Sequence, residues 1–172
     1  MKRISAPESD PAGEGDLPSP GPTPDALRGR ALALLTRREH SRVELERKLV
    51  ELGGAATDVA AVLDELVERR LQSDERFAEV FVRSRAEKGY GPRAIAADLR
   101  ARGLDAGQVE AALADSGYDW LRRALEVRQA RFGRQLPLDP REKARQLRFL
   151  QYRGFSGGDC ARALRCEELD PD

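Results

Sequence analysis

The stretch LRARGLDAGQVEAAL, residues 99–113, recurs in outline twice more along the chain. Each copy has a Leu, a Gly four residues later, a Val or Cys six residues after that, and a Leu four residues further on. The other copies occupy residues 49–63 and 150–164, so the shared glycines are 50 and 51 residues apart: Gly53, Gly103 and Gly154. A fixed period of this length is typical of repeat proteins, in which one supersecondary unit stacks on the next. Such arrays present an extended surface to a large partner, so the pattern favours a binding function.

Helix starts and stops frame each copy. Ser41-Arg42-Val43-Glu44 and Asp105-Ala106-Gly107-Gln108 are typical of capping boxes, and Asp139-Pro140 places a cap directly before a proline at the first helical position. The shared glycines fall where a left-handed residue ends a helix. We therefore expect helices over residues 25–38, 42–52, 57–71, 74–88, 92–102, 106–115, 117–132, 140–153 and 157–166.

No segment alternates with a period of two, so we expect no sheet. The predicted fold is all-α, an elongated array of three tandem three-helix repeats. The expected divisions are a Pro- and Gly-rich disordered tail, three repeats and an acidic C-terminal tail, over residues 1–24, 25–71, 72–117, 118–166 and 167–172.

The repeated apolar positions are expected to form the cores of the three units, as are the aromatic residues Phe77, Phe81 and Trp120 of the expected first helices. Cys160 stands where the other copies have Val59 and Val109, so we expect a small buried side chain there. Cys160 and Cys166 are six residues apart and do not face each other on a helix, which argues against a disulfide between them.

Several classes of function lack their sequence signals. A single histidine, His40, has no cysteine or carboxylate cluster around it at metal-ligand spacing, and no nucleotide-binding or nucleophile-elbow motif is present. We therefore expect no catalytic activity, no cofactor and no metal. No apolar run is long enough to span a membrane, and the N-terminus lacks the apolar core of a signal peptide, so we expect a soluble cytoplasmic protein without a membrane partner.

Charge is distributed unevenly although the net charge of the chain is zero. Residues 118–166 carry 12 Lys and Arg against 5 Asp and Glu, a net charge of +7, whereas residues 25–71 are balanced and residues 72–117 have a net charge of −1. The third repeat is therefore a basic module in a neutral protein.

Two sets of basic and aromatic residues are candidates for the binding surface. One lies on a single stripe of the helix expected from Pro140, at spacings of four, three and four residues: Arg141, Arg145, Arg148 and Tyr152. A weaker set spans the end of one helix of the second repeat and the next helix: Arg83, Arg85, Lys88, Tyr90, Arg93 and Arg100.

Three interpretations of these residues stay open on physical grounds. The arginines form a solvated face, or they neutralise nucleic-acid phosphates, or they dock onto an acidic protein surface with Arg and Tyr as anchors. Because a net charge of +7 is concentrated in the third repeat, the last two interpretations are favoured over the first.

Three stretches of the chain resemble the RecX family, whose members modulate the RecA recombinase of bacteria. They are REHSRVELERKL (38–49), LQSDERFAEVFVRSRAEKGYGPRAIAADLRARGL (71–104) and EKARQLRFLQYRGFS (142–156), and they occur in the order and spacing of the family. The resemblance runs from about Ala26 to Leu164. It is most specific in the central stretch, at Asp74, Phe77-Ala78, Phe81-Val82, Arg85, Gly89, Ile95, Leu99 and Arg102-Gly103.

The resemblance implies a crescent of three repeats that binds along the groove of the RecA–DNA filament and inhibits ATP hydrolysis and strand exchange, in recombination, DNA repair and the SOS response. It also implies that DNA, single- or double-stranded, is a possible second partner. We expect a monomer. The alternative is a helical-repeat protein that binds DNA through its basic face without obligatory contact to RecA.

Overall fold

The computed structural model describes residues 21–166 of the chain, and within that range it is entirely helical with no strand. The helices of the described range are α1 (Pro24–Leu35), α2 (Arg42–Glu51), α3 (Ala56–Glu68), α4 (Asp74–Glu87), α5 (Pro92–Arg100), α6 (Ala106–Ala114), α7 (Trp120–Phe132), α8 (Pro140–Tyr152) and α9 (Gly157–Ala163). The expected all-α array is confirmed, and the expected helices match the observed ones to within three residues at each end. The predictions for residues 1–20 and 167–172 lie outside the described range, and Pro24, which was assigned to the tail, is the first residue of α1.

Short polar side chains begin most of the helices. Ser73, Asp105, Asp139 and Ser156 each accept a hydrogen bond from a backbone N–H of the first turn that follows. The capping box at Asp105 is complete, because Gln108 accepts in return from the backbone N–H of Asp105. The full box expected at Ser41 is wrong, because only its first half forms.

Glu44 is the residue that leaves the Ser41 box incomplete. The Ser41 hydroxyl accepts from the Glu44 N–H at 3.1 Å, but the Glu44 carboxylate pairs with Arg38 and Arg102. Arg102 belongs to the next repeat, so an inter-repeat contact replaces a local one. Sequence spacing alone carries no information about such a competitor.

The three shared glycines end the second helix of each repeat, as expected. Gly53, Gly103 and Gly154 have φ values of 89°, 90° and 90°, in the region that favours glycine. In each copy the N–H of the residue after the glycine donates to the carbonyl of the shared leucine five residues earlier, over 3.1–3.3 Å. This pattern is a Schellman stop, and it gives the three second helices the same ending.

Each repeat encloses its own hydrophobic core. The buried clusters comprise side chains of α1–α3, of α4–α6 and of α7–α9, and they include the shared Leu and Val or Cys positions. Two of the shared leucines are exceptions: Leu113 is half-buried at the edge of the second core, and Leu164 is buried but lies outside the third cluster. Trp120 packs against both the second and the third core and so links these repeats.

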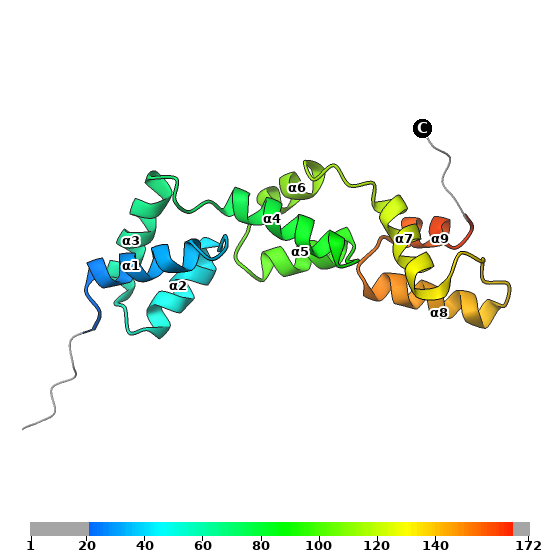
Figure 1. The fold of residues 1–172 in the computed structure, drawn as a ribbon, viewed down its shortest axis with the longest axis horizontal. Helices are drawn as coiled ribbons and strands as arrows, with labels where there is room; N and C mark the ends of the chain where they lie inside the picture. Colours follow the sequence, from blue (N-terminus) through cyan, green and yellow to red (C-terminus); the bar gives the residue numbers. More distant parts are fainter. Residues whose placement is uncertain (1–20, 167–172) are drawn as a thin grey trace, which may run out of the picture.

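The second helices follow one another head to tail along one edge of the molecule, α8 then α5 then α2 (Figure 1). At the first junction the Ser41 hydroxyl donates to the Arg102 carbonyl at 2.7 Å. At the second junction the Gly91 N–H donates to the Arg153 carbonyl at 2.7 Å, and the Arg93 N–H donates to the Gly154 carbonyl at 2.9 Å. Carbonyls at the C-terminal end of one helix thus accept hydrogen bonds from donors at the N-terminal end of the neighbouring helix. This is the relative orientation that the helix dipoles favour.

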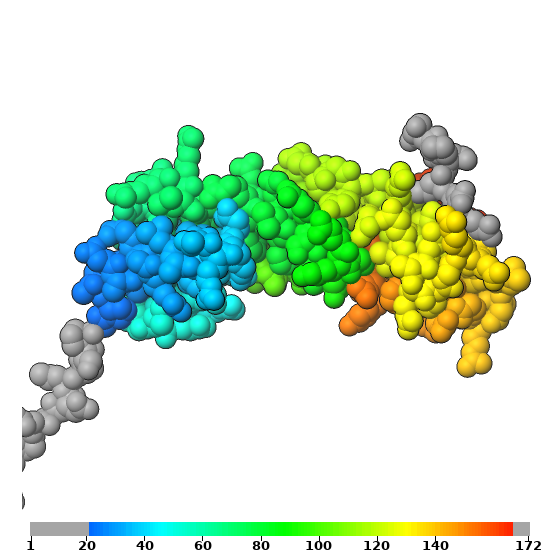
Figure 2. Space-filling model, viewed as in Figure 1, coloured from blue at the N-terminus to red at the C-terminus, as the bar shows by residue number. Residues whose placement is uncertain are grey.

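The resulting molecule is elongated and curved. Its outline is hollowed below the middle repeat, on the edge along which α2, α5 and α8 run (Figure 2). The crescent expected from the family resemblance is therefore present, and the second helices line its hollow edge.

Candidate basic interface

Arg93 and Arg100 lie on α5 and Arg141 and Arg148 lie on α8, so all four belong to the row of second helices. All four side chains are exposed, and none of them has an ion-pair partner within residues 21–166. An arginine without a carboxylate partner keeps its full charge and all its donors available for another molecule. These four arginines are therefore uncompensated positive charges on the row of second helices, where Lys143 of α8 is also exposed without an ion pair in the described range.

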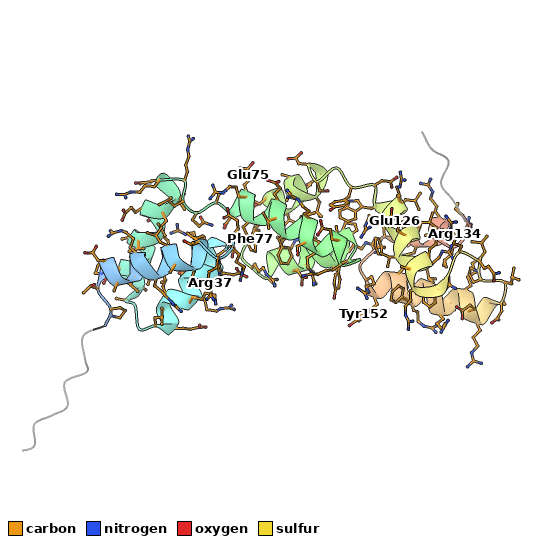
Figure 3. The ribbon with its side chains drawn as sticks, viewed as in Figure 1. Arg37, Glu75, Phe77, Glu126, Arg134 and Tyr152 are labelled. Atoms are coloured by element: carbon orange, nitrogen blue, oxygen red, sulfur yellow. The ribbon has the colours of Figure 1, made fainter. Side chains whose placement is uncertain are left out.

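Tyr152 is the last residue of α8 and is 85% exposed. In Figure 3 its side chain extends from the end of α8 that lies beside the middle repeat, away from the ribbon. The predicted stripe of α8 therefore ends in a free aromatic ring at the hollow edge.

Arg145 differs from its neighbours on the stripe because it is paired. Its guanidinium lies 2.8 Å from the Glu142 carboxylate and 5.0 Å from the centre of the Phe132 ring. The hydrogen bond from Arg145, followed by that from Gln146, lowers the pKa of Glu142, and the same ion pair raises the pKa of Arg145. About one unit of the positive charge of the stripe is thus neutralised within the helix.

Arg85 and Tyr90 make intramolecular contacts. Arg85 pairs with Asp98 and its guanidinium lies 3.7 Å from the centre of the Tyr90 ring. Arg153 covers the same ring at 5.0 Å. Two guanidinium groups therefore contact the Tyr90 ring, one from its own repeat and one from the next.

This stack is part of a longer series of alternating cations and rings that crosses both junctions. Arg102, from the second repeat, lies 4.6 Å from the Phe81 ring and 3.3 Å from the Glu44 carboxylate of the first repeat. The whole series reads Glu44, Arg102, Phe81, Arg85, Tyr90, Arg153 and Phe149. These side chains orient the repeats relative to one another.

Arg83 lies on α4 and Lys88 is its C-cap, so neither belongs to the row of second helices. Arg83 pairs with Glu79 at 2.6 Å and borders a groove of about 680 Å³ between α4 and α6. Lys88 is exposed, and its carbonyl accepts a hydrogen bond from Arg153 at 3.1 Å. The ten predicted residues therefore divide into three sets: an exposed set on α5 and α8 (with Arg145 paired), the contacting pair Arg85 and Tyr90 within the second repeat, and Arg83 and Lys88 on α4 and at its C-cap.

Arg102 and Arg153 are two further candidates for functional residues. The sequence did not indicate their contacts with residues of a neighbouring repeat. Both immediately precede the shared glycine of their repeat, and both stack on an aromatic ring across or near a junction. Their common repeat position is the signal that identifies them. Arg123 acts similarly, because its guanidinium donates to the carbonyls of Ala86 and Glu87 at the end of α4.

Residues with metal-binding or nucleophilic chemistry are scattered. Within residues 21–166, no three His, Cys, Asp or Glu side chains are grouped so that they could hold a metal ion. His40 is buried, and its Nδ1 lies 3.0 Å from the Arg38 carbonyl. Burial raises the pKa of the Cys160 thiol to about 11, so this side chain stays protonated in its core, as expected of a small apolar residue.

None of the helices in the described range is long and apolar enough to cross a membrane.

Comparison with known proteins identifies each repeat. Models of the first, second and third three-helix domains of RecX match residues 28–66, 73–113 and 118–164. The Regulatory protein RecX of Pseudomonas syringae pv. tomato is 48% identical over 139 residues, which cover 81% of this chain and 90% of that protein. The Regulatory protein RecX of Halorhodospira halophila is 45% identical over 152 residues, or 88% of this chain and 94% of that protein.

Solved structures share the fold. The crystal structure of RecX from Lactobacillus salivarius aligns with a TM-score of 0.71 at 21% identity, over 83% of this chain and 94% of that one. A second crystal structure, of regulatory protein RecX, aligns with a TM-score of 0.67 at 20% identity, over 83% of this chain and 73% of that one. The helical fold of this chain is therefore shared with both crystal structures.

Proposed function

The chain belongs to the RecX family of regulatory proteins, and we propose on this premise that it binds the RecA nucleoprotein filament and inhibits ATP hydrolysis, strand exchange and filament growth by RecA. In this role it acts in recombination, DNA repair and the SOS response in the cytoplasm, as a monomer, by binding and not by catalysis.

The observation that carries the proposal is the row of second helices along the hollow edge. The row is built from hydrogen-bonded junctions, and it displays Arg93, Arg100, Arg141, Arg148 and Tyr152 without intramolecular ion pairs in the described range. A curved row of cations suits a helical groove that is lined by acidic protein and by phosphate.

Inhibition follows if the protein binds one state of the filament more tightly than another. RecA must change state to hydrolyse ATP and to exchange strands. A ligand that bridges neighbouring subunits shifts this equilibrium tenfold for each differential of about 1.4 kcal/mol. The contacts of Arg102 with Phe81 and of Arg153 with Tyr90 support such a role, because contacts near the junctions favour one curvature of the crescent and so one spacing of subunits.

The second candidate function is DNA binding without obligatory contact to RecA. The net charge of +7 on residues 118–166 favours it, since arginines that release counterions from phosphates need no protein partner. In that case the protein would bind single-stranded DNA and would not bind RecA alone.

Purified RecA without DNA separates the two functions. We expect the wild-type protein to bind it, and we expect Arg141→Glu/Arg148→Glu to weaken binding at least about tenfold, because attraction becomes repulsion at two exposed positions. Arg30→Glu/Arg162→Glu is the matched control, since it makes the same charge change at exposed arginines of α1 and α9. Binding to DNA but not to RecA would establish the second function instead.

A further inference from the structure

Two large apolar side chains are almost fully exposed, and they flank α8. Leu138 is 97% exposed two residues before α8 begins, and Tyr152 is 85% exposed at its end. Every other exposed large apolar side chain of the described range is 36–49% exposed. At a rise of about 1.5 Å per residue, the helix holds the two side chains about 20 Å apart. Isolated apolar residues of moderate exposure are ordinary on a protein surface, but these two are nearly bare.

The loop that carries Leu138 is held in place from beneath. Arg128 of α7 is completely buried, and its Nη1 and Nη2 donate to the carbonyls of Gln135 and Arg134 at 3.0 and 3.1 Å. A buried guanidinium is costly unless it is hydrogen-bonded, and here some of its donors serve to fix the loop backbone.

The sequence on both sides of Leu138 restricts it further. Pro137 precedes it, Pro140 follows two residues later, and Asp139 caps α8 by accepting from the Arg141 and Glu142 N–H groups. Leu138 is therefore presented on an ordered support, so that less conformational entropy is lost when it is buried against a partner.

The charges between the two apolar side chains indicate the kind of partner. Arg141 and Arg148 are exposed without an ion-pair partner in residues 21–166, and Arg145 is neutralised by Glu142. A nucleic acid would match the arginines and could stack a base on Tyr152, but it offers Leu138 no apolar socket on its phosphate backbone. A protein surface with carboxylates between two apolar pockets matches all four side chains.

We infer that α8, with Leu138 and Tyr152 as apolar anchors at its two ends and Arg141 and Arg148 between them, is a protein-docking element. It takes an acidic protein surface with two apolar pockets about 20 Å apart. The inference rests on the proposed function, in which that surface belongs to RecA. Beyond that function, we assign the contacts of α8 to a protein surface and not to DNA. We also add Leu138, which lies outside the basic stripe, as a contact residue.

The test compares full-length variants on two probes. The first probe is RecA assembled on single-stranded DNA with a slowly hydrolysed ATP analogue, and the second is the same DNA without RecA. Leu138→Ser and Tyr152→Ser each remove an exposed side chain, so circular dichroism and thermal unfolding should match the wild type. Val67→Ser is the control, because Val67 is a 43% exposed apolar residue on α3.

We expect Leu138→Ser and Tyr152→Ser each to weaken binding to the filament at least about tenfold, as removal of an interface anchor does. We expect Val67→Ser to bind as the wild type, and all variants to keep wild-type affinity for naked DNA. Wild-type filament affinity in Leu138→Ser would overturn the inference and leave the proposed function standing. An equal loss on naked DNA in Tyr152→Ser would identify a nucleic-acid surface and overturn it too. If the wild-type protein fails to bind RecA, both the proposed function and the inference fall.

Discussion

Gly154 lies so close to Ala94 that a β-carbon at residue 154 would come within 2.4 Å of the Ala94 backbone nitrogen. The contact joins the third repeat to the second, beside the hydrogen bond from the Arg93 N–H to the Gly154 carbonyl. Gly103 has the corresponding relationship to the Val43 side chain, where an added β-carbon would lie 2.2 Å from Cγ2. These glycines therefore end a helix and also allow two repeats to meet.

A pair of glycine variants separates these two roles. Gly53→Ala is strained only by its positive φ, because the nearest atom to its β-carbon is 3.6 Å away, so we expect a loss of about 1 kcal/mol. Gly154→Ala has the same φ but also meets the backbone of Ala94, so we expect a further loss of about 1–3 kcal/mol. Urea unfolding measures both values. Equal losses would show that the junction yields freely and does not hold the repeats.

Arg85 provides a second stability test, because its contacts are internal. Arg85→Lys keeps the charge but loses the planar stack on Tyr90 and the geometry of the pair with Asp98, and we expect a loss of about 1–2 kcal/mol. Arg83→Lys is the control, since Arg83 makes only an exposed ion pair with Glu79 and should change stability by a few tenths of a kcal/mol. Thermal unfolding of the two variants decides the matter. Equal stability would mean that Arg85 contributes no more than a solvated arginine.

Stability should fall in mild acid because of His40. Burial, which is the largest cause, lowers the pKa of His40 in the folded protein below its ordinary value near 6.5. The unfolded chain then binds more protons between the two pKa values, so the free energy of unfolding decreases as pH falls below about 6.5 and levels off below the folded pKa. His40→Gln should lack this decrease. Urea midpoints measured between pH 7.5 and 5 provide the check, and parallel curves for both proteins would contradict the assignment.

Two truncations locate the start of the first repeat. The hydroxyl of Thr23 accepts from the Ala26 N–H, Pro24 is the first residue of α1, and Pro22 lies against Gly53. Removal of residues 1–24 should therefore destabilise the first repeat by about 1 kcal/mol relative to removal of residues 1–20, through the lost cap. Differential scanning calorimetry of the two proteins measures the difference. Identical melting temperatures would show that the cap contributes nothing.

The fold could be predicted from the sequence because its signals are local. Ser73 and Asp105 begin helices through bonds that reach only three residues ahead, and Gly103 ends one through its own φ. Helical spacing likewise placed Leu49 and Leu99 in cores, since each repeat buries the same face. The capping box predicted at Ser41 is incomplete for a non-local reason. The Glu44 carboxylate forms an ion pair with Arg102, which lies 58 residues further along the chain.

The candidate surface was less predictable because its residues are sorted by long-range contacts. Arg85 and Arg148 look alike on a helical projection, but Arg85 is enclosed by Asp98 and Tyr90 and Arg148 is free to bind. Arg128 resembles any other arginine of α7, yet it is buried beneath the loop it supports. The partners of such residues are backbone carbonyls or rings elsewhere in the chain, which residue spacing does not encode.

Inhibition of RecA through the row of second helices should be visible in the rate of ATP hydrolysis. The most direct measurement is the rate of ATP hydrolysis by RecA on single-stranded DNA, titrated with the wild-type protein and with Arg141→Glu/Arg148→Glu. We predict a dose-dependent fall with the wild type, and a curve displaced at least about tenfold to higher concentration for the variant, with unchanged helical content. An ATPase rate that stays constant as the wild-type protein is added in excess over RecA would contradict the account.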